Sequence, residues 1–274
     1  MAIEIISPSL LLFFVIRNKI IITENMKIDK VNYKNIYKKA AKQGGWSKRK
    51  LDNTAKWGDF YEVARKELHG TEAVLDIGTA EGNRFMGLSK HIKKGVGIDL
   101  EPEMIRLANQ NKRKAMVKNI IFRCMDANCL DFPAGTFDVI TIKHSPINFK
   151  ESFRVLKSGG RLFTQQVCEN DKLNLKKTFD RGQDYGKKAG ALLERYKKQA
   201  EQAGFKNIKV KVSNIPYYFK SKKKLFDFLN KAPTIPGFGK TNDYDTLERF
   251  IKNNRAAKGI KSNTSRFFLE MSKE

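Results

Sequence analysis

Ala73-Val-Leu-Asp-Ile-Gly-Thr-Ala-Glu-Gly82 joins a short apolar run to a turn that contains two glycines. The apolar run predicts a buried strand that ends at Gly78. From Glu81 to Ile92 the large apolar side chains recur at helical spacing, which predicts a helix directly after the turn. Glycines let the backbone turn sharply, and the first turn of a helix leaves backbone N–H groups free to meet a ligand.

Strands and helices alternate after this turn. Four further apolar runs predict strands at 95–99, 119–124, 137–142 and 161–167. Helical spacing begins at Pro102 and again at Phe149. Short apolar strands that alternate with amphipathic helices indicate an α/β fold, with a parallel sheet covered by helices on both faces.

The flanking regions are less regular. A helical pattern from about Lys34 ends near Gly70, whereas Leu175 to Gly190 is polar, basic and rich in glycine, without a regular pattern. The remaining predicted elements are a helix marked by Leu193, Tyr196 and Ala200, a strand at 205–212, helices at 222–230 and 245–254 around a loop at 232–239, and a last strand at 265–271.

Charge gives two possible interpretations. The chain has 54 basic and 29 acidic residues and a formal net charge of +25, which is typical of proteins that bind nucleic acid or anionic membranes. The basic residues are spread along the whole chain, which favours a general compositional bias instead. One exception is Lys27–Lys50, where nine basic residues accompany a single acidic one, Asp29.

The first 25 residues differ from the rest. Ile5–Ile16 is apolar but too short to cross a membrane, and its flanking charges do not match a secretory signal. We expect residues 1–25 to be an upstream extension or a misassigned start, with Met26 as the natural beginning. The three cysteines are odd in number and lack metal-ligand spacing, which favours a reducing cytoplasm over a disulfide framework or a zinc site.

An acidic residue completes the nucleotide-site pattern. Asp99 ends the next predicted strand, 21 residues after Gly78, where a carboxylate can accept both hydroxyls of a ribose. The turn alone is equally compatible with a tight structural connection, but the turn and the carboxylate together favour a ligand site. Ala80 stands at the middle position of the turn, so the dinucleotide pattern G-x-G-x-x-G is absent and a nucleoside without phosphate fits better. Gly239-Lys-Thr241 lacks the rest of a Walker motif, which argues against an NTPase.

These motifs resemble those of the class I S-adenosylmethionine (SAM)-dependent methyltransferases. Residues 74–82 are similar to motif I of that family and Gly97–Met104 to motif II. Met125–Ala127 with 130–140, and Arg154-Val-Leu-Lys-Ser-Gly-Gly-Arg161, resemble later motifs of the UbiE-like, small-molecule subgroup. The resemblance implies a Rossmann-like three-layer sandwich with a seven-stranded mixed sheet and an antiparallel last strand. It implies one methyltransferase domain over 26–274, comprising a helical lead-in (30–69), a SAM-binding core (70–170) and acceptor-side elements (171–274).

The resemblance also implies the roles of individual residues toward SAM. Gly78 and Gly82, with Thr79 and Ala80 between them, would form the loop beside the methionine part. Asp76 would orient this loop or meet the amino group through water. The residues implied at the nucleoside are Asp99 at the ribose, Leu100 and Ala127 at the adenine ring, and Asp126 at the adenine amino group. The alternatives are that Asp126 caps a helix and that Leu100 belongs to the core.

Acceptor residues are less clearly marked. His144 follows the fourth predicted strand, where it would act as a general base, bind the acceptor or be an ordinary loop residue. Trp57 and Tyr61 would form a lid over SAM or, as we favour, pack in the core. Tyr217–Phe219 and the loop Pro233–Phe238 would either roof the acceptor pocket or pack locally.

The predicted function is methyl transfer from SAM to a small molecule. An RNA methyltransferase is the first alternative, motivated by Lys27–Lys50 and by Lys220, Lys222, Lys223 and Lys224, although the motifs of base-modifying enzymes are absent. A non-catalytic SAM-binding protein is the second. No metal requirement, stable membrane span or particular oligomeric state is indicated by the sequence.

Overall fold

The computed structural model describes residues 38–42, 44–46 and 60–274 of the chain. Residues 38–42 are helical, and the first complete element is α2 (Phe60–Arg65). The described residues do not include 1–25, Met26, Trp57 or most of the basic segment Lys27–Lys50. The interpretations of these residues therefore stay predictions.

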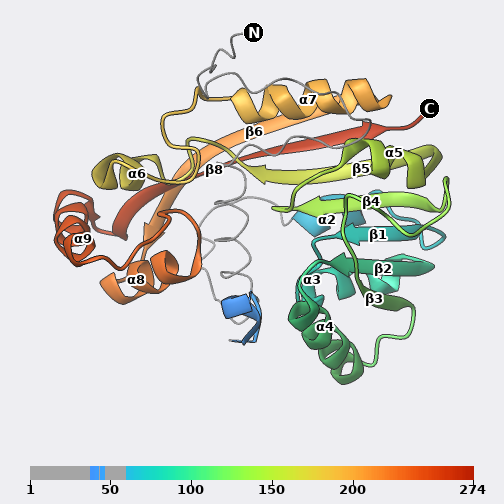
Figure 1. Cartoon of the computed structure of the whole chain (residues 1–274), viewed down its shortest axis with the longest axis horizontal. Helices are drawn as coiled ribbons and strands as arrows, with labels where there is room; N and C mark the ends of the chain where they lie inside the picture. The colour runs from blue at the N-terminus through green and yellow to red at the C-terminus, as the bar shows by residue number, and fades with distance from the viewer. Residues whose placement is uncertain (1–37, 43, 47–59) are drawn as a thin grey trace, which may run out of the picture.

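A mixed sheet in the order β3-β2-β1-β4-β5-β8-β6 forms the centre of the molecule (Figure 1). Its strands are β1 (Ala73–Ile77), β2 (Lys94–Asp99), β3 (Ile120–Cys124), β4 (Phe137–Lys143), β5 (Leu156–Val167), β6 (Lys206–Phe219) and β8 (Gly259–Ser272). The first five run parallel, while β8 is antiparallel to both β5 and β6. The predicted mixed sheet with an antiparallel last strand is therefore confirmed. The two-residue strand β7 (Arg255–Ala256), which was not predicted, pairs with β8.

Alternate residues of the central strands pack on opposite faces of the sheet. Val74, Val139 and Phe163 join a cluster with α2, α3 (Asn83–Met86) and α4 (Pro102–Ala115). Their neighbours Leu75 and Ile140 belong to a second cluster, with α5 (Phe149–Val155) and α7 (Ala191–Ala203). Because side chains alternate along a strand, this division places helices on both faces, as the sequence predicts.

Two local predictions were wrong. The helix expected from Glu81 to Ile92 is the four-residue α3 followed by a 3-10 turn at Ser89–His91, because the helix ends at Gly87. The apolar residues that suggested a longer helix are nevertheless buried. The irregular stretch Leu175–Gly190 begins within a helix, α6 (Leu173–Phe179), whose buried residues include Leu175 and Phe179.

Strands β6 and β8 extend well beyond the predicted 205–212 and 265–271. They pair as far as Phe219 and Ile260, and this ribbon projects past the sheet to where α6, α8 (Lys222–Lys231) and α9 (Thr241–Asn253) gather (Figure 1). Tyr217 and Phe219 are buried in the core that these helices share. Local packing, one of the two interpretations of Tyr217–Phe219, therefore accounts for both aromatic rings.

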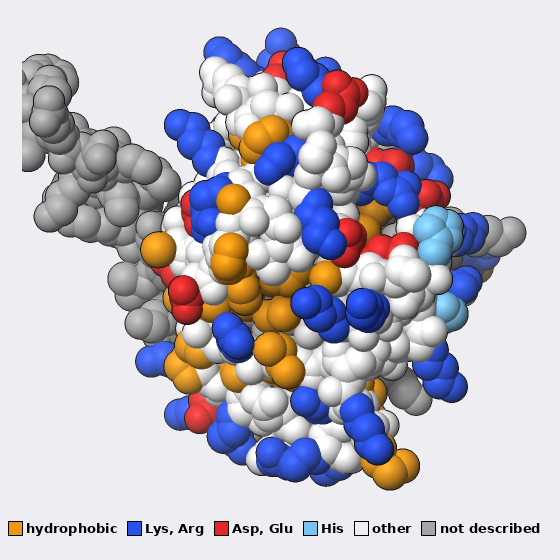
Figure 2. All heavy atoms as spheres, turned by 90° about the vertical axis from the view of Figure 1, so that its right-hand side faces the viewer, with side chains coloured by type: hydrophobic (Ala, Val, Ile, Leu, Met, Phe, Trp, Pro, Cys, Tyr) orange, Lys and Arg blue, Asp and Glu red, His pale blue; other side chains and the backbone are white. Residues whose placement is uncertain are grey.

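Basic side chains are dispersed over the face shown in Figure 2, among acidic and apolar ones. This distribution agrees with a general compositional bias on that face. Lys220, Lys222, Lys223 and Lys224 are exposed where β6 ends and α8 begins. Among the helices of the described residues, none has the length and apolar character that crossing a membrane would need.

Candidate functional site

The turn after β1 is held in shape by contacts within the protein. The backbone N–H groups of Gly78 and Thr79 both donate to the Ile98 carbonyl, each at 2.9 Å, which ties the turn to β2. Gly78 has a φ of +76°, and a Cβ there would lie 2.5 Å from the Cβ of Ser145. A Cβ on Gly82, at a φ of +75°, would lie 2.5 Å from the Phe122 ring. Protein packing alone thus requires glycine at both positions.

Asp99 lies at the end of β2 and faces this turn. Its Oδ2 accepts the Ala80 N–H at 2.9 Å, and its Oδ1 accepts the Glu101 N–H at 2.9 Å. An ionised carboxylate has about four lone-pair positions, so these two bonds leave about two for hydroxyl groups. Burial raises the pKa of Asp99 above its ordinary value, although the two N–H donors oppose this effect.

Asp76 is fully buried beneath the turn and receives hydroxyl groups from two other elements. Thr141 Oγ1 donates to its Oδ1 at 2.7 Å, and the Tyr61 hydroxyl lies 3.1 Å from the same atom. Burial raises the pKa of Asp76 to about 6, against the opposing effect of the hydroxyls of Thr141, Thr79 and Tyr61. Tyr61 is 8% exposed, so it packs in the core, as favoured from the sequence. Asp76 therefore links β1 to α2 and β4 directly beneath the turn.

Three more of the predicted residues lie beyond Asp99. Leu100 is 67% exposed, which excludes the interpretation that it belongs to the core. The Asp126 carboxylate accepts the Asn128 N–H at 2.8 Å, and the residues after it form a turn rather than the helix it was suggested to cap. Ala127 is half-buried and packs against the main core.

Carboxylates predominate at the ends of β1 and β2. Glu81 and Glu101 are both buried, and their charges add to the raised pKa of Asp99. Glu81 also accepts the Trp46 backbone N–H at 2.9 Å, and Trp46 and Ala80 both pack against the cluster of Ala40, Ala41 and Met104. The described part of the N-terminal region therefore contacts the turn through residues that sequence reasoning did not identify.

His144 follows β4 with a left-handed backbone, at a φ of +54°. Its N–H donates to the Gln165 carbonyl at 2.9 Å, so it extends the pairing of β4 with β5. The residue is exposed to solvent, although neighbouring protein atoms partly desolvate its ring. This desolvation, with the positive charges of Arg266, Lys143 and Arg84, holds the pKa of His144 well below its ordinary value, so the imidazole is neutral near pH 7.

Comparison with known proteins connects this geometry to a family. Residues 74–160 match the model of a methyltransferase domain. The chain is 31% identical over 106 residues to the uncharacterized methyltransferase YcgJ of Bacillus subtilis, covering 36% of this chain and 42% of that protein. It is 29% identical over 118 residues to the ubiquinone/menaquinone biosynthesis C-methyltransferase UbiE of Agrobacterium fabrum, covering 39% and 46%. Residues 74–160 therefore form a class I SAM-dependent methyltransferase domain of the UbiE-like kind.

The fold comparison extends beyond the matched motifs. The crystal structure of YcgJ from Bacillus subtilis superposes with a TM-score of 0.57 at 18% identity, covering 78% of this chain and 98% of that one. By contrast, the sequence matches span less than half the length of either curated relative. The class I methyltransferase fold is thus shared over most of the described chain, while the match to the methyltransferase domain model covers residues 74–160.

The structure brings the motif residues of this methyltransferase together at one edge of the sheet. Gly78 and His144 follow the carboxyl ends of β1 and β4, and Asp99 is the last residue of β2; the three strands are neighbours in the sheet. The edge also includes Thr141 and Ser145, which sequence reasoning did not identify. Thr141 was signalled only by its polar character within an apolar strand. In the described residues, no group of three or more His, Cys, Asp or Glu side chains is arranged to hold a metal ion.

Proposed function

We propose that this protein binds SAM at the motif I turn and transfers its methyl group to a small-molecule acceptor. The observation that carries the proposal is the arrangement of Asp99. Its carboxylate is held by two backbone N–H groups beside the turn and keeps lone pairs for the ribose hydroxyls. The exposed Leu100 side chain next to it offers an apolar surface for adenine.

The chemistry of the residues present fits this cofactor. SAM supplies an electrophilic methyl group on a positively charged sulfonium. The buried carboxylates Asp76, Glu81 and Glu101 favour a cationic ligand near the turn. The loop Gly78–Gly82, with Thr79 and Ala80, would hold the methionine part. Asp126 and Ala127 would meet the adenine.

His144 would lie on the acceptor side of the site. The neutral imidazole can accept a hydrogen bond from the acceptor or take its proton. Its lowered pKa makes it a weak base, however. Methyl transfer gains much from holding the acceptor in a near-attack geometry, so orientation is the main role that we propose for His144.

Several observations support a small acceptor in the cytoplasm. The relative UbiE is, by its name, a methyltransferase of ubiquinone and menaquinone biosynthesis, and both of these quinones are small molecules. The three cysteines are odd in number and lack metal-ligand spacing, which favours a reducing compartment. The described part of the surface that motivated the RNA alternative consists of the exposed lysines Lys38, Lys39, Lys42, Lys220, Lys222, Lys223 and Lys224.

Asp99→Asn is expected to weaken the binding of S-adenosylhomocysteine (SAH) about 30-fold, or by about 2 kcal/mol, because the amide cannot replace both hydroxyl acceptors. Isothermal titration calorimetry on the full chain measures this loss. The matched control is Asp131→Asn, which changes an exposed carboxylate and should leave SAH binding unchanged.

The outcomes separate the alternatives. If the wild-type chain does not bind SAH, the proposed function is wrong. If it binds SAH but releases none from SAM with any acceptor, the non-catalytic interpretation is correct. Transfer to RNA alone, with binding that falls steeply with salt, would instead support the RNA alternative.

A further inference from the structure

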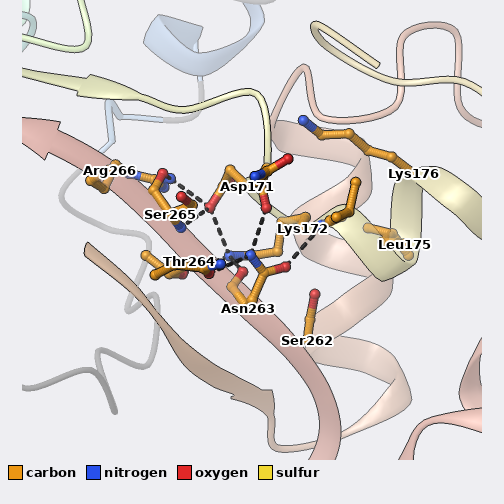
Figure 3. Close-up of polar contacts among 12 residues, drawn as sticks. Asp171, Lys172, Leu175, Lys176, Ser262, Asn263, Thr264, Ser265 and Arg266 are labelled. Carbon is orange, nitrogen blue, oxygen red and sulfur yellow. Dashed lines mark hydrogen bonds and ion pairs between the residues drawn. The ribbon is translucent and has the colours of Figure 1, made fainter. Parts of the chain in front are cut away.

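A buried ionic cluster lies between the loop after β5 and strand β8. Figure 3 shows Asp171 between Arg266 and Lys172. Asp171 Oδ1 lies 2.5 Å from Arg266 Nη1 and accepts the Ser265 N–H at 2.9 Å. Although burial raises the pKa of Asp171, the two cations hold it below its ordinary value. Asp171 is thus an ionised anchor for Arg266.

Lys172 has its donors occupied within this cluster. Its Nζ donates to the Asn263 carbonyl and to Thr264 Oγ1, both at 2.7 Å, and lies 4.4 Å from the centre of the Tyr217 ring. The side chain is 3% exposed. Lys172 therefore joins the loop to β8 and is not available to a ligand.

Arg266, unlike Lys172, has donor groups that the cluster does not occupy. Nη1 donates to the Ser265 carbonyl at 2.7 Å in addition to its contact with Asp171. In the described part of the chain, Nε and Nη2 of Arg266 have no hydrogen-bond or ion-pair partner, although the side chain is only 17% exposed. These two nitrogens form a planar donor fork, which matches two oxygens of a carboxylate or phosphate.

The strand register places Arg266 on the acceptor side. Lys143 pairs with Gln165, and Val167, two residues further along β5, pairs with Arg266 on β8. Paired residues and residues two apart share a face of the sheet, so Lys143 and Arg266 lie on the same face. Because β4 and β8 are separated by β5 alone, these two strands lie about 10 Å apart, and the two-residue offset along β5 adds about 7 Å in the strand direction.

The two ends of the site carry opposite charge. Near the motif I turn, Glu81 and Glu101 are buried carboxylates and Asp99 is a half-buried one. At His144, by contrast, three positive charges act on the imidazole, those of Arg266, Lys143 and Arg84. Among the leading contributions from the described residues, the one negative charge is that of Asp171. Of these, Arg266 acts most strongly on the imidazole. This field favours an anion beside His144 and disfavours a cation.

We propose that the methyl acceptor carries an oxyanion group, a carboxylate or a phosphate, which binds to the Nε–Nη2 fork of Arg266. Asp171 and the Ser265 carbonyl hold Nη1 and thereby orient the fork. The inference rests on the proposed methyltransferase function, because it assigns Arg266 to the acceptor part of that site. Arg266 is a binding residue in this proposal, while Asp171 is a positioning residue.

The test uses the full chain saturated with SAH and selectively ¹⁵N-labelled at arginine. Benzoate, phenyl phosphate and the neutral benzamide are titrated separately while the arginine Nε–H signals are recorded by NMR. We expect benzoate or phenyl phosphate to shift one signal that is missing from Arg266→Lys, and we expect benzamide to leave it unchanged. The stronger of the two anions distinguishes a carboxylate acceptor from a phosphate acceptor. Arg195 and Arg255, which are exposed on α7 and β7, are internal controls whose signals should not move.

The variants keep the result interpretable. Arg266→Lys retains a cation for Asp171 but lacks the fork, and should weaken anion binding at least tenfold with unchanged SAH affinity. Equal shifts at Arg195, or anion binding unaffected by Arg266→Lys, would overturn the inference. Failure to bind SAH would instead count against the proposed function, and the same titration without SAH would still test Arg266.

Discussion

Gly78→Ala is expected to destabilise the protein by about 3 kcal/mol and to weaken SAH binding about 100-fold. Gly78 has a φ of +76°, and non-glycine residues pay about 1–2 kcal/mol for a left-handed backbone. The new Cβ would also lie 2.5 Å from the Cβ and 2.6 Å from the Oγ of Ser145, and overpacking of this kind typically costs about 1–3 kcal/mol. Relief of the contact would move the turn that is proposed to hold SAM. Urea denaturation and calorimetry measure the two effects.

Two matched variants separate the backbone strain from the contact. Gly186 has a φ of +81° but open space where a Cβ would lie, so Gly186→Ala measures the strain alone. Ser145→Gly removes the atoms that the new Cβ would meet. We expect Gly78→Ala to be about 1–2 kcal/mol less destabilising in the Ser145→Gly background. If the two losses simply add, Ser145 does not constrain the turn.

Asp76→Asn is expected to change the pH dependence of stability. The folded-state pKa of Asp76 is raised to about 6 from an ordinary 3.8, so the folded state binds more protons than the unfolded state between these values. Stability from this group therefore falls as pH rises through that window. At pH 7.5 the ionised side chain costs about 3 kcal/mol, of which about 2 kcal/mol develops between pH 4.5 and pH 7.5.

The asparagine variant removes this titration and keeps an oxygen that can accept from Thr141 and Tyr61. Its free energy of unfolding, relative to wild type, should therefore increase by about 2 kcal/mol from pH 4.5 to pH 7.5. Urea denaturation at both pH values measures this change, whatever constant effect the amide itself has. Asp245→Asn alters an exposed carboxylate and should show no such increase. A constant difference between Asp76→Asn and wild type would mean that Asp76 does not titrate in this range.

The juxtaposition of the motif I turn and Asp99 was predictable because its pattern is local. A strand, a glycine turn and a carboxylate at the end of the next strand lie within 73–99, and parallel strands that adjoin in the sheet bring their ends to one edge. The lengths of β6 and β8 were not predictable in the same way. Their outer halves are stabilised by pairing with each other and by α6, α8 and α9, and no periodicity within either strand indicates this.

The polar contacts that surround the candidate site depended on the tertiary structure. Thr141 meets Asp76 across 65 residues of sequence, and Ser265 meets Asp171 across 94. Both contacts exist because the sheet places β4 beside β1 and inserts β8 between β5 and β6. Residues such as Arg266 acquire partners only through this strand order, whereas the glycines of the turn are required by the conformation of the chain at their own positions.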